Sequence, residues 1–402
     1  MLGAASLATM QMAQPAWSQS SPIRIGMLSV KSGALAAGGR QMEDGFSLFL
    51  RERGNTIAGR PVELIVADTA GQPAQAKTKA QELIQRSGVH MVVGPVAAFE
   101  ALAINDYFQE AQIPFICCSA AAEDLTQRKL NPWFIRTSST SAQPCHALGD
   151  HAAKELGYKR IATIADDFAF GQEQTAGFQR VFEASGGSIT TKLWAPLNAA
   201  DYGSYISQLS GVDAVFAAFA GANGLRFLKQ YNEYGMKDQI PVIAAMTTVD
   251  EGVLHSMGDE ALGIVSAGWY SAALDTPENT KFVSALRGVA GVDPGFYSAG
   301  AYSAGLALEK ALTEIGGKAE DKNALMAALK KAVIPNDPRG PWRVDAYGNP
   351  VQNIYIRKVE RKDGRLVNSV VKTYDNVTQF WTYPPEAFLK EPVYSRNDPT
   401  RI

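Results

Sequence analysis

The sequence predicts an α/β protein with two lobes, each built on a mostly parallel sheet that is covered by helices. Short apolar runs alternate with amphipathic stretches from Pro22 to Cys118, which is typical of parallel sheets buried on both faces. The same alternation restarts at Ala142 and continues to Ala267. One sheet holding all of these strands is less common than two smaller sheets, and 402 residues are enough for two cores.

The first part of the chain is expected to form one sheet with its helices. Each apolar run is short and bounded by Gly, Pro or Asp, and each amphipathic stretch is long enough for three or more turns. We predict strands over residues 23–30, 62–68, 90–94 and 114–118, and helices over 37–53, 73–86 and 99–112.

The second part repeats this arrangement after a Ser/Thr-rich stretch at residues 137–143, where we place the boundary between the lobes. This stretch lacks apolar periodicity, as expected of a connection. We predict helices over residues 142–156, 172–185, 202–209 and 224–234, and strands over 160–165, 188–194, 214–220, 241–246 and 263–267.

The pattern changes after Tyr270, where longer helical stretches follow one another without strands between them. We predict helices over 277–289, 296–316 and 323–332, then a break at four Pro and Gly residues between 335 and 341. Residues 354–359 and 366–372 are expected to form a hairpin across Asp363-Gly364, a favoured turn dipeptide. The aromatic and Pro-rich tail from Val377 is expected to lie extended on the surface.

Composition argues against several classes of protein. The formal net charge of −2 argues against nucleic-acid binding and against a polybasic membrane-surface protein. Three cysteines cannot build a disulfide framework. The sequence has no apolar run of about 20 residues, the length that a membrane-spanning helix needs.

Residues 1–21 carry no charge and are rich in Ala, Leu, Met, Gln and Ser. Leu2 to Ala8 resembles the apolar part of an export signal, and Ala16-Trp17-Ser18 resembles its cleavage site. A basic beginning is missing, so we interpret the stretch as the remnant of a signal whose start lies upstream. The alternative is a disordered cytoplasmic leader.

The usual signatures of catalysis are absent, and we expect no enzyme activity, no metal centre and no cofactor. No Gly-x-Gly-x-x-Gly follows the first strand, and the histidines have no common metal-ligand spacing. Asp166 and Asp167 stand at a strand end, but adjacent residues of an extended chain point to opposite sides. We therefore expect this pair to have a structural or hinge-lining role rather than an acid–base role.

Several segments, in order, resemble the branched-chain-amino-acid type of periplasmic solute-binding protein from ABC transporters. The resemblance starts with Ile23-Arg24-Ile25-Gly26 and continues through Ser32 to Gly39 and Gly45 to Leu48. No single motif is decisive, but the ordered set covers most of the chain. Further matching segments are 66–68, 73–76, 92–95, 113–116, 119–126, 166–171, 297–302 and 345–349.

This resemblance implies the type I clamshell, with two Rossmann-like lobes joined by a three-strand hinge that closes around a small ligand. It also implies periplasmic localisation, delivery of the ligand to an inner-membrane ABC permease, no nucleic-acid partner and a monomer. We expect residues 22–140 plus 270–343 in the first lobe, 141–269 plus 344–376 in the second, and 377–402 in the tail. A ligand-sensing regulator on the same fold is the alternative.

The resemblance also implies where the ligand lies. Amino-acid binders of the family hold the ligand carboxylate with hydroxyl and N–H groups of two first-lobe loops, and the ligand ammonium with an acidic residue of the second lobe. The positions that align with that acid lie near Ala220 and Thr247, and neither is acidic. The residues that we expect to contact ligand are Ala98, Phe99, Ser119, Ala120, Ala121, Phe170, Phe219, Thr247 and Tyr297.

These residues favour an aromatic carboxylate of the benzoate or hydroxycinnamate type. Aromatic side chains pack well against a flat ring, and Ser119 with the N–H groups of Ala120 and Ala121 suits a carboxylate. An ammonium group buried without a charge partner would be costly. A branched-chain amino acid, a short aliphatic acid or an amide is the alternative ligand.

The resemblance further implies that a disulfide found in many amino-acid binders is missing here, because Ala70 and Ala97 stand at the aligned positions. Cys117 and Cys118 end a predicted strand, and Cys145 lies near the start of a helix. The sequence leaves open whether Cys145 pairs with either of them.

Overall fold

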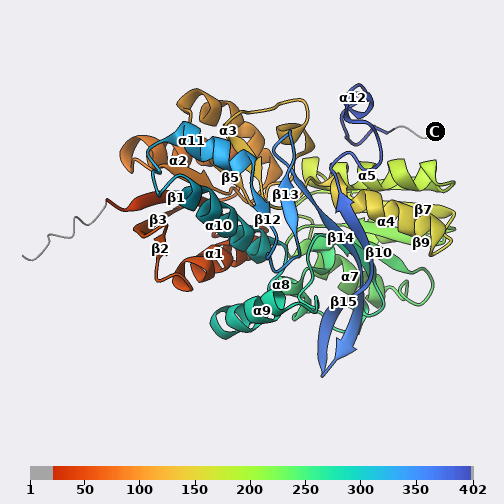
Figure 1. The fold of residues 1–402 in the computed structure, drawn as a ribbon. Helices are drawn as coiled ribbons and strands as arrows, with labels where there is room; N and C mark the ends of the chain where they lie inside the picture. Colours follow the sequence, from red (N-terminus) through yellow and green to blue (C-terminus); the bar gives the residue numbers. More distant parts are fainter. Residues whose placement is uncertain (1–20, 400–402) are drawn as a thin grey trace, which may run out of the picture.

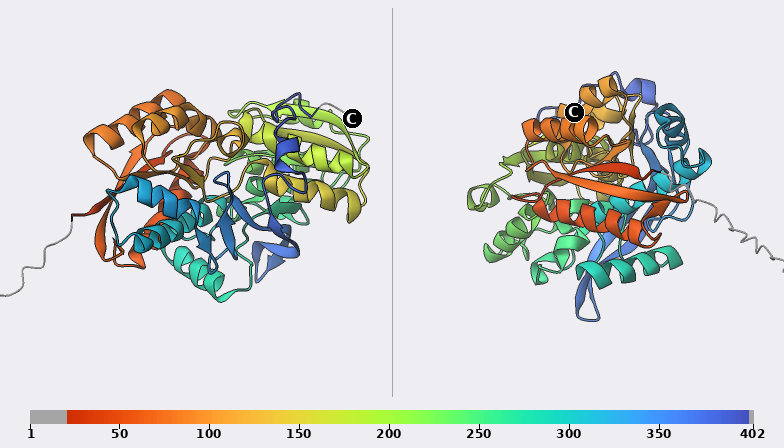
Figure 2. Two further views of the ribbon diagram at one scale, coloured as in Figure 1. Left: turned by 45° about the horizontal axis from the view of Figure 1, so that its top comes forward. Right: turned by 90° about the vertical axis from the view of Figure 1, so that its left-hand side faces the viewer.

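The computed structural model describes residues 21–399 and contains two sheets, each with helices on both faces (Figures 1 and 2). The chain passes between the two sheets at three places. These are the connection between β6 and α4, the connection between β11 and α9, and the return from α11 to β12. The predicted two-lobe α/β fold is therefore confirmed. The predicted export signal lies outside the described residues except for Ser21.

The first sheet has the strand order β2-β3-β1-β4-β5-β6 and is parallel except for β2. Helix α1 packs against α10, and α2 packs against α3. The strands are β1 (Ile23–Ser29), β2 (Thr56–Ile57), β3 (Arg60–Asp68), β4 (Met91–Val93), β5 (Phe115–Cys117) and β6 (Phe134–Arg136). The helices are α1 (Ala36–Arg51), α2 (Pro73–Gln81), α3 (Ala98–Ala111), α9 (Pro277–Ala290), α10 (Phe296–Glu314) and α11 (Lys322–Lys330).

The second sheet has the order β12-β13-β14-β11-β10-β9-β7-β8, and β15 pairs with β14. Strands β7 to β11 are parallel, and β14 joins β11 in the antiparallel sense. The strands are β7 (Arg160–Asp166), β8 (Ser188–Ala195), β9 (Ala214–Ala218), β10 (Val242–Ala245), β11 (Val265–Gly268), β12 (Val333–Ile334), β13 (Trp342–Val344), β14 (Pro350–Lys362) and β15 (Arg365–Val377). The helices are α4 (Ala142–Lys154), α5 (Ala169–Ala184), α6 (Gly203–Ile206), α7 (Asn223–Glu233) and α8 (Glu251–Leu254).

The structure differs from the predicted elements mainly where they are short. The three-residue strand β6 carries too few residues to show a pattern, and the predicted helix over 73–86 ends as a π-helical turn at Glu82–Arg86. The hairpin is confirmed, and each of its strands is longer than predicted. Asp363 and Gly364 have φ of 49° and 77°, the left-handed values that a two-residue hairpin turn needs. Strand β12, inside the segment predicted for the first lobe, is hydrogen-bonded into the second sheet.

All three cysteines, Cys117, Cys118 and Cys145, are free and buried. Burial raises the pKa of the Cys117 thiol to about 11, which disfavours the reactive thiolate. None of the helices within residues 21–399 has the length and apolar character needed to cross a bilayer.

The C-terminal segment after β15 folds over the second lobe and includes a one-turn helix, α12 (Pro385–Phe388), where the sequence predicted an extended tail (Figure 1). Phe380, Phe388 and Tyr394 form a small apolar cluster against α4 and α5. Arg128, which follows β5, donates to the carbonyl oxygens of Phe388 and Glu391 at 3.4 and 2.8 Å. The segment therefore contacts both lobes.

We expect replacement of Phe388 by alanine to lower the free energy of unfolding by about 3–5 kcal/mol, because the buried ring packs among other aromatic rings. The matched control is Val393→Ala, at an exposed position of the same segment. The measurement is chemical denaturation of both variants. Equal stabilities for the two variants would mean that the segment is not docked in solution.

Candidate ligand-binding site

A narrow cavity, part of it open to solvent, lies between the two sheets. It is formed by the loops that follow β1, β4, β5, β7 and β9, together with the start of α10. These loops leave the carboxyl ends of parallel strands, where ligands of open α/β sheets bind. The lining residues are Leu35, Val96, Ala97, Ala98, Ser119, Ala121, Phe168, Phe170, Ala220, Phe296 and Tyr297.

Aromatic rings connect the two sides of this cavity. The rings of Phe99 and Phe168 meet edge to face with centroids 5.7 Å apart, and Phe168 lies 6.0 Å from Phe170. Phe170 is in turn 6.4 Å from Phe296, whose ring meets Tyr297 edge to face at 5.1 Å. Such spacings are typical of favourable aromatic pairs. The arrangement offers a planar, apolar ligand contacts with rings from both lobes.

The polar groups of the lining are few. The Ser119 hydroxyl donates to the carbonyl oxygen of Val96 at 2.8 Å, so a bound carboxylate has to compete for this donor. The N–H of Ala98 belongs to the first turn of α3, where helices leave backbone donors unpaired. The N–H of Ala121 lies outside any helix or strand and donates to no acceptor in the described part of the chain. These groups suit an anionic ligand end.

Five of the predicted contact residues line this cavity, namely Ala98, Ser119, Ala121, Phe170 and Tyr297. All five are at most 8% exposed. They come from four separate segments of the chain, which the fold brings together. Their contact with a ligand remains a prediction.

Four predicted residues lie outside the lining of this cavity. Phe99 stands behind Phe168, and the Ala120 N–H already donates to the carbonyl oxygen of Pro95 at 3.3 Å. Phe219 packs in the core of the second lobe against Tyr202 and Phe227. The Thr247 hydroxyl donates to the carbonyl oxygen of Phe219 at 2.7 Å.

Other lining residues were not among the predicted contacts. Phe168 is the residue before α5 and stands two residues before Phe170 in the first turn of that helix, and Phe296 directly precedes Tyr297 at the start of α10. Phe168 and Phe296 could have been found from the sequence because each lies close along the chain to a predicted contact residue. The small apolar residues Leu35, Val96 and Ala97 carry no chemical signal of their own, whereas Ala220 lies near a position that the resemblance marks.

Asp166 and Asp167 point to different surroundings. Asp166 is buried and accepts hydrogen bonds from the N–H of Ala220 at 2.8 Å and the side chain of Asn223 at 2.6 Å. Burial raises its pKa to about 7. Asp167 pairs with Arg396 of the C-terminal segment. Asp166 therefore fixes the loop that carries Ala220.

Asp250 links the second lobe to helix α10 of the first. Its carboxylate accepts hydrogen bonds from the N–H of Phe296 at 2.6 Å and from the N–H of Gly252 at 3.0 Å. It thereby caps the first turns of both α10 and α8. The start of α10, which carries Phe296 and Tyr297 into the cavity, is thus held by a residue from the opposite lobe.

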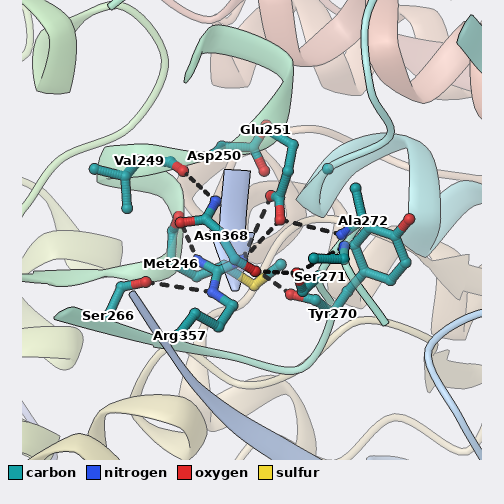
Figure 3. Close-up of polar contacts among 12 residues, drawn as sticks. Met246, Val249, Asp250, Glu251, Ser266, Tyr270, Ser271, Ala272, Arg357 and Asn368 are labelled. Atoms are coloured by element: carbon teal, nitrogen blue, oxygen red, sulfur yellow. Dashed lines mark hydrogen bonds and ion pairs between the residues drawn. The ribbon is translucent and has the colours of Figure 1, made fainter. Parts of the chain in front are cut away.

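A buried arginine holds the segment that contains Asp250 (Figure 3). Arg357 of β14 donates to the carbonyl oxygens of Met246 and Tyr270 at 3.2 and 2.9 Å, and lies 3.4 Å from the carboxylate of Glu251. Asn368 donates to the carbonyl oxygen of Val249 at 2.9 Å. Together these bonds fix both ends of the turn that precedes Asp250.

Two buried carboxyl groups meet where the lobes join. Glu123 follows β5, and Glu173 lies on α5. The Glu123 N–H donates to Glu173 at 3.3 Å, the Glu123 carboxylate accepts the N–H of Ala142 at 2.7 Å, and Glu173 accepts the hydroxyl of Ser141 at 2.6 Å. Burial raises the pKa of both carboxyl groups, and the nearby Arg136 offsets this only in part. The junction therefore favours protonation of this pair.

Comparison with protein families gives one match that covers most of the chain. Residues 22–365 match the family described as periplasmic binding protein. The Leu/Ile/Val-binding protein homolog 6 of Brucella melitensis is 28% identical over 362 residues, which cover 88% of this chain and 92% of that protein.

Two solved structures from Rhodopseudomonas palustris are similar in fold and sequence. The solute-binding protein of an ABC transporter from strain BisB5, in complex with 3,4-dihydroxy benzoic acid, is 36% identical with a TM-score of 0.85. The alignment covers 89% of this chain and 98% of that one. A second ABC-transporter solute-binding protein, in complex with benzoate, is 28% identical with a TM-score of 0.83 and coverages of 89% and 98%.

We expect Arg357→Met to lower the free energy of unfolding by about 3–5 kcal/mol, because it leaves buried carbonyl oxygens and Glu251 without their partner. Arg361→Met, on the same strand but at an exposed ion pair, should cost less than about 1 kcal/mol. Urea denaturation of both variants measures the difference. Equal losses would show that the Arg357 contacts do not support the site.

We expect the stability of the protein to fall as pH rises through about 7, where Glu123 loses its proton in the folded state. A carboxyl group whose folded pKa is raised contributes stability that is complete below its unfolded pKa and is lost as pH rises through its folded pKa. Glu173→Gln keeps that position neutral and should flatten the dependence of melting temperature on pH between 5 and 8. The exposed Glu233→Gln is the control; a wild-type profile that rises over this range would contradict the account.

Proposed function

Because the chain belongs to the periplasmic binding protein family, we propose that it is the periplasmic solute-binding component of an ABC importer for a small aromatic carboxylate. The lobes close around this ligand by bending at the hinge and exclude water from it. The closed complex then delivers the ligand to an inner-membrane permease. The chain acts as a monomer and does not alter the ligand chemically.

The lining of the cavity is the observation that supports an aromatic ligand. Phe168, Phe170, Phe296 and Tyr297 present rings, and the other lining residues except Ser119 are aliphatic. A planar ring gains most from such contacts. The hydroxyl of Ser119 and the N–H groups of Ala98 and Ala121 provide donors for a single carboxylate.

The arrangement of acidic residues near the cavity favours a carboxylic acid ligand that has no ammonium group. None of the lining residues is acidic. Three buried carboxyl groups next to lining residues, Glu100, Asp166 and Asp250, accept hydrogen bonds from backbone N–H groups and are thereby engaged. An ammonium placed here would be buried without a dedicated charge partner, which is unfavourable.

Branched-chain amino acids are the second candidate, because the Brucella melitensis relative carries the name Leu/Ile/Val-binding protein homolog 6. An amide ligand, or a sensing role on the same fold, would use the same cavity. The choice between these ligand classes depends on whether the pocket accepts an ammonium group.

Thermal unfolding of refolded, ligand-free protein tests the proposal. Benzoates and hydroxycinnamates at about 100 times their dissociation constant should each add about 2.7 kcal/mol to the free energy of unfolding. Leucine, valine, short aliphatic acids and amides at the same concentrations should not. Stabilisation by leucine or valine alone would contradict the aromatic ligand class.

We expect Ser119→Ala to weaken binding of the aromatic acid by about tenfold, because a hydrogen bond to a charged carboxylate is lost. Ser204→Ala, at an exposed position of α6, is the matched control and should bind normally. Titration calorimetry measures both variants. Unchanged affinity in Ser119→Ala would place the carboxylate elsewhere in the cavity.

A further inference from the structure

The hydroxyl of Tyr297 is a side-chain polar group of the cavity lining that, like the Ala121 N–H, has no hydrogen-bond partner within residues 21–399. The residue is 5% exposed, and it lines the cavity. The hydroxyl is not among the fully buried side-chain atoms that lack a partner, so water can pair with it in the free protein and a bound molecule can replace that water. The cavity thus contains a polar position that the chain itself leaves open.

The ring that carries this hydroxyl is held from several directions. It lies against Gly38 of α1 so closely that a Cβ atom at that position would stand 2.8 Å from the ring carbons Cε1 and Cζ. Phe296 packs edge to face against it, and Asp250 anchors the helix start through the Phe296 N–H. The hydroxyl is therefore preorganised and cannot turn away to find another partner without disturbing this packing.

Acidic side chains lie near one polar group of the cavity, the Tyr297 hydroxyl, and N–H donors lie near others. Asp250 and Asp166 of the second lobe lie close enough to Tyr297 to raise the pKa of its phenol, together with burial, which is the largest cause. Tyr297 therefore stays neutral and keeps its proton. A ligand carboxylate beside these two acidic side chains would be disfavoured, whereas the N–H groups of Ala98 and Ala121 favour it. At the start of α3 the Ala97 N–H is already taken, by Glu100.

We infer that Tyr297 is a specificity-determining residue that recognises a ring hydroxyl, and that the preferred ligands are benzoates hydroxylated opposite the carboxylate. This inference rests on the proposed function. The carboxylate lies toward Ser119 and the start of α3, the ring packs against Phe168 and Phe170, and the ligand hydroxyl pairs with the Tyr297 hydroxyl. The Rhodopseudomonas palustris neighbour that was solved with 3,4-dihydroxy benzoic acid holds a ligand of this class.

Titration calorimetry with 4-hydroxybenzoate and benzoate on the full chain and on Tyr297→Phe tests the inference. The wild-type chain should bind 4-hydroxybenzoate about tenfold more tightly than benzoate, because the hydroxyl adds one buried hydrogen bond. Tyr297→Phe should lose this preference through weaker binding of 4-hydroxybenzoate, while benzoate binds with unchanged or higher affinity.

The matched control is Tyr302→Phe, the same chemical change on the same helix. The Tyr302 hydroxyl donates to Glu52 at 2.6 Å and is not part of the cavity lining, so its loss should leave the ratio of the two affinities unchanged. This control also shows whether removal of a buried tyrosine hydroxyl from α10 impairs folding, which thermal unfolding of both variants measures.

The outcomes separate this inference from the proposed function. Equal wild-type affinities for the two acids would overturn the role of Tyr297 and leave the aromatic ligand class standing. A Tyr297→Phe variant that loses affinity for both acids by the same factor would do the same. If neither acid binds to the wild-type chain, the proposed function itself fails.

Discussion

The carboxylate of Asp250 is the contact on which the geometry of the cavity depends. It joins the start of α8 to the start of α10, and so fixes the second lobe against the helix that carries Phe296 and Tyr297. Gly295 makes this possible, because a Cβ atom there would stand 2.3 Å from an Asp250 carboxylate oxygen. Arg357 and Asn368 hold the preceding turn from the hairpin side (Figure 3). The pocket is thus shaped by polar bonds outside its apolar lining.

The pocket lining is mostly apolar, whereas the bonds that hold the lining in place are polar. This difference matters for how a ligand would be recognised. Aromatic rings supply most of the contact area but distinguish poorly between planar ligands of similar size, since apolar contacts are not directional. In the proposed complex, selectivity therefore depends on the few polar atoms, chiefly those of Ser119, Ala121 and Tyr297. The acidic pair Glu123–Glu173 lies at the junction of the same two lobes, and we expect its protonation to couple the stability of this junction to pH.

The sequence predicts the fold well because parallel strands that are buried on both faces read as apolar runs, as for β1 and β7. It predicts the site less completely. Ser119 and Phe170 stand in segments that the resemblance marks. Phe219 follows a core strand, and the apolar character of that strand does not indicate which side Phe219 faces. Asp250 and Arg357 could not be found from the sequence, because their partners lie 46 and 111 residues away along the chain.

A crystal structure of the protein grown with 3,4-dihydroxybenzoate tests the central claim most directly. We expect ligand density between the two sheets, with the ring among Phe168, Phe170 and Phe296 and the carboxylate toward Ser119. Density in the surface groove between the end of α9 and the β14–β15 hairpin, near Arg287 and Arg365, would contradict it. So would a ligand between the sheets with its carboxylate against Tyr297.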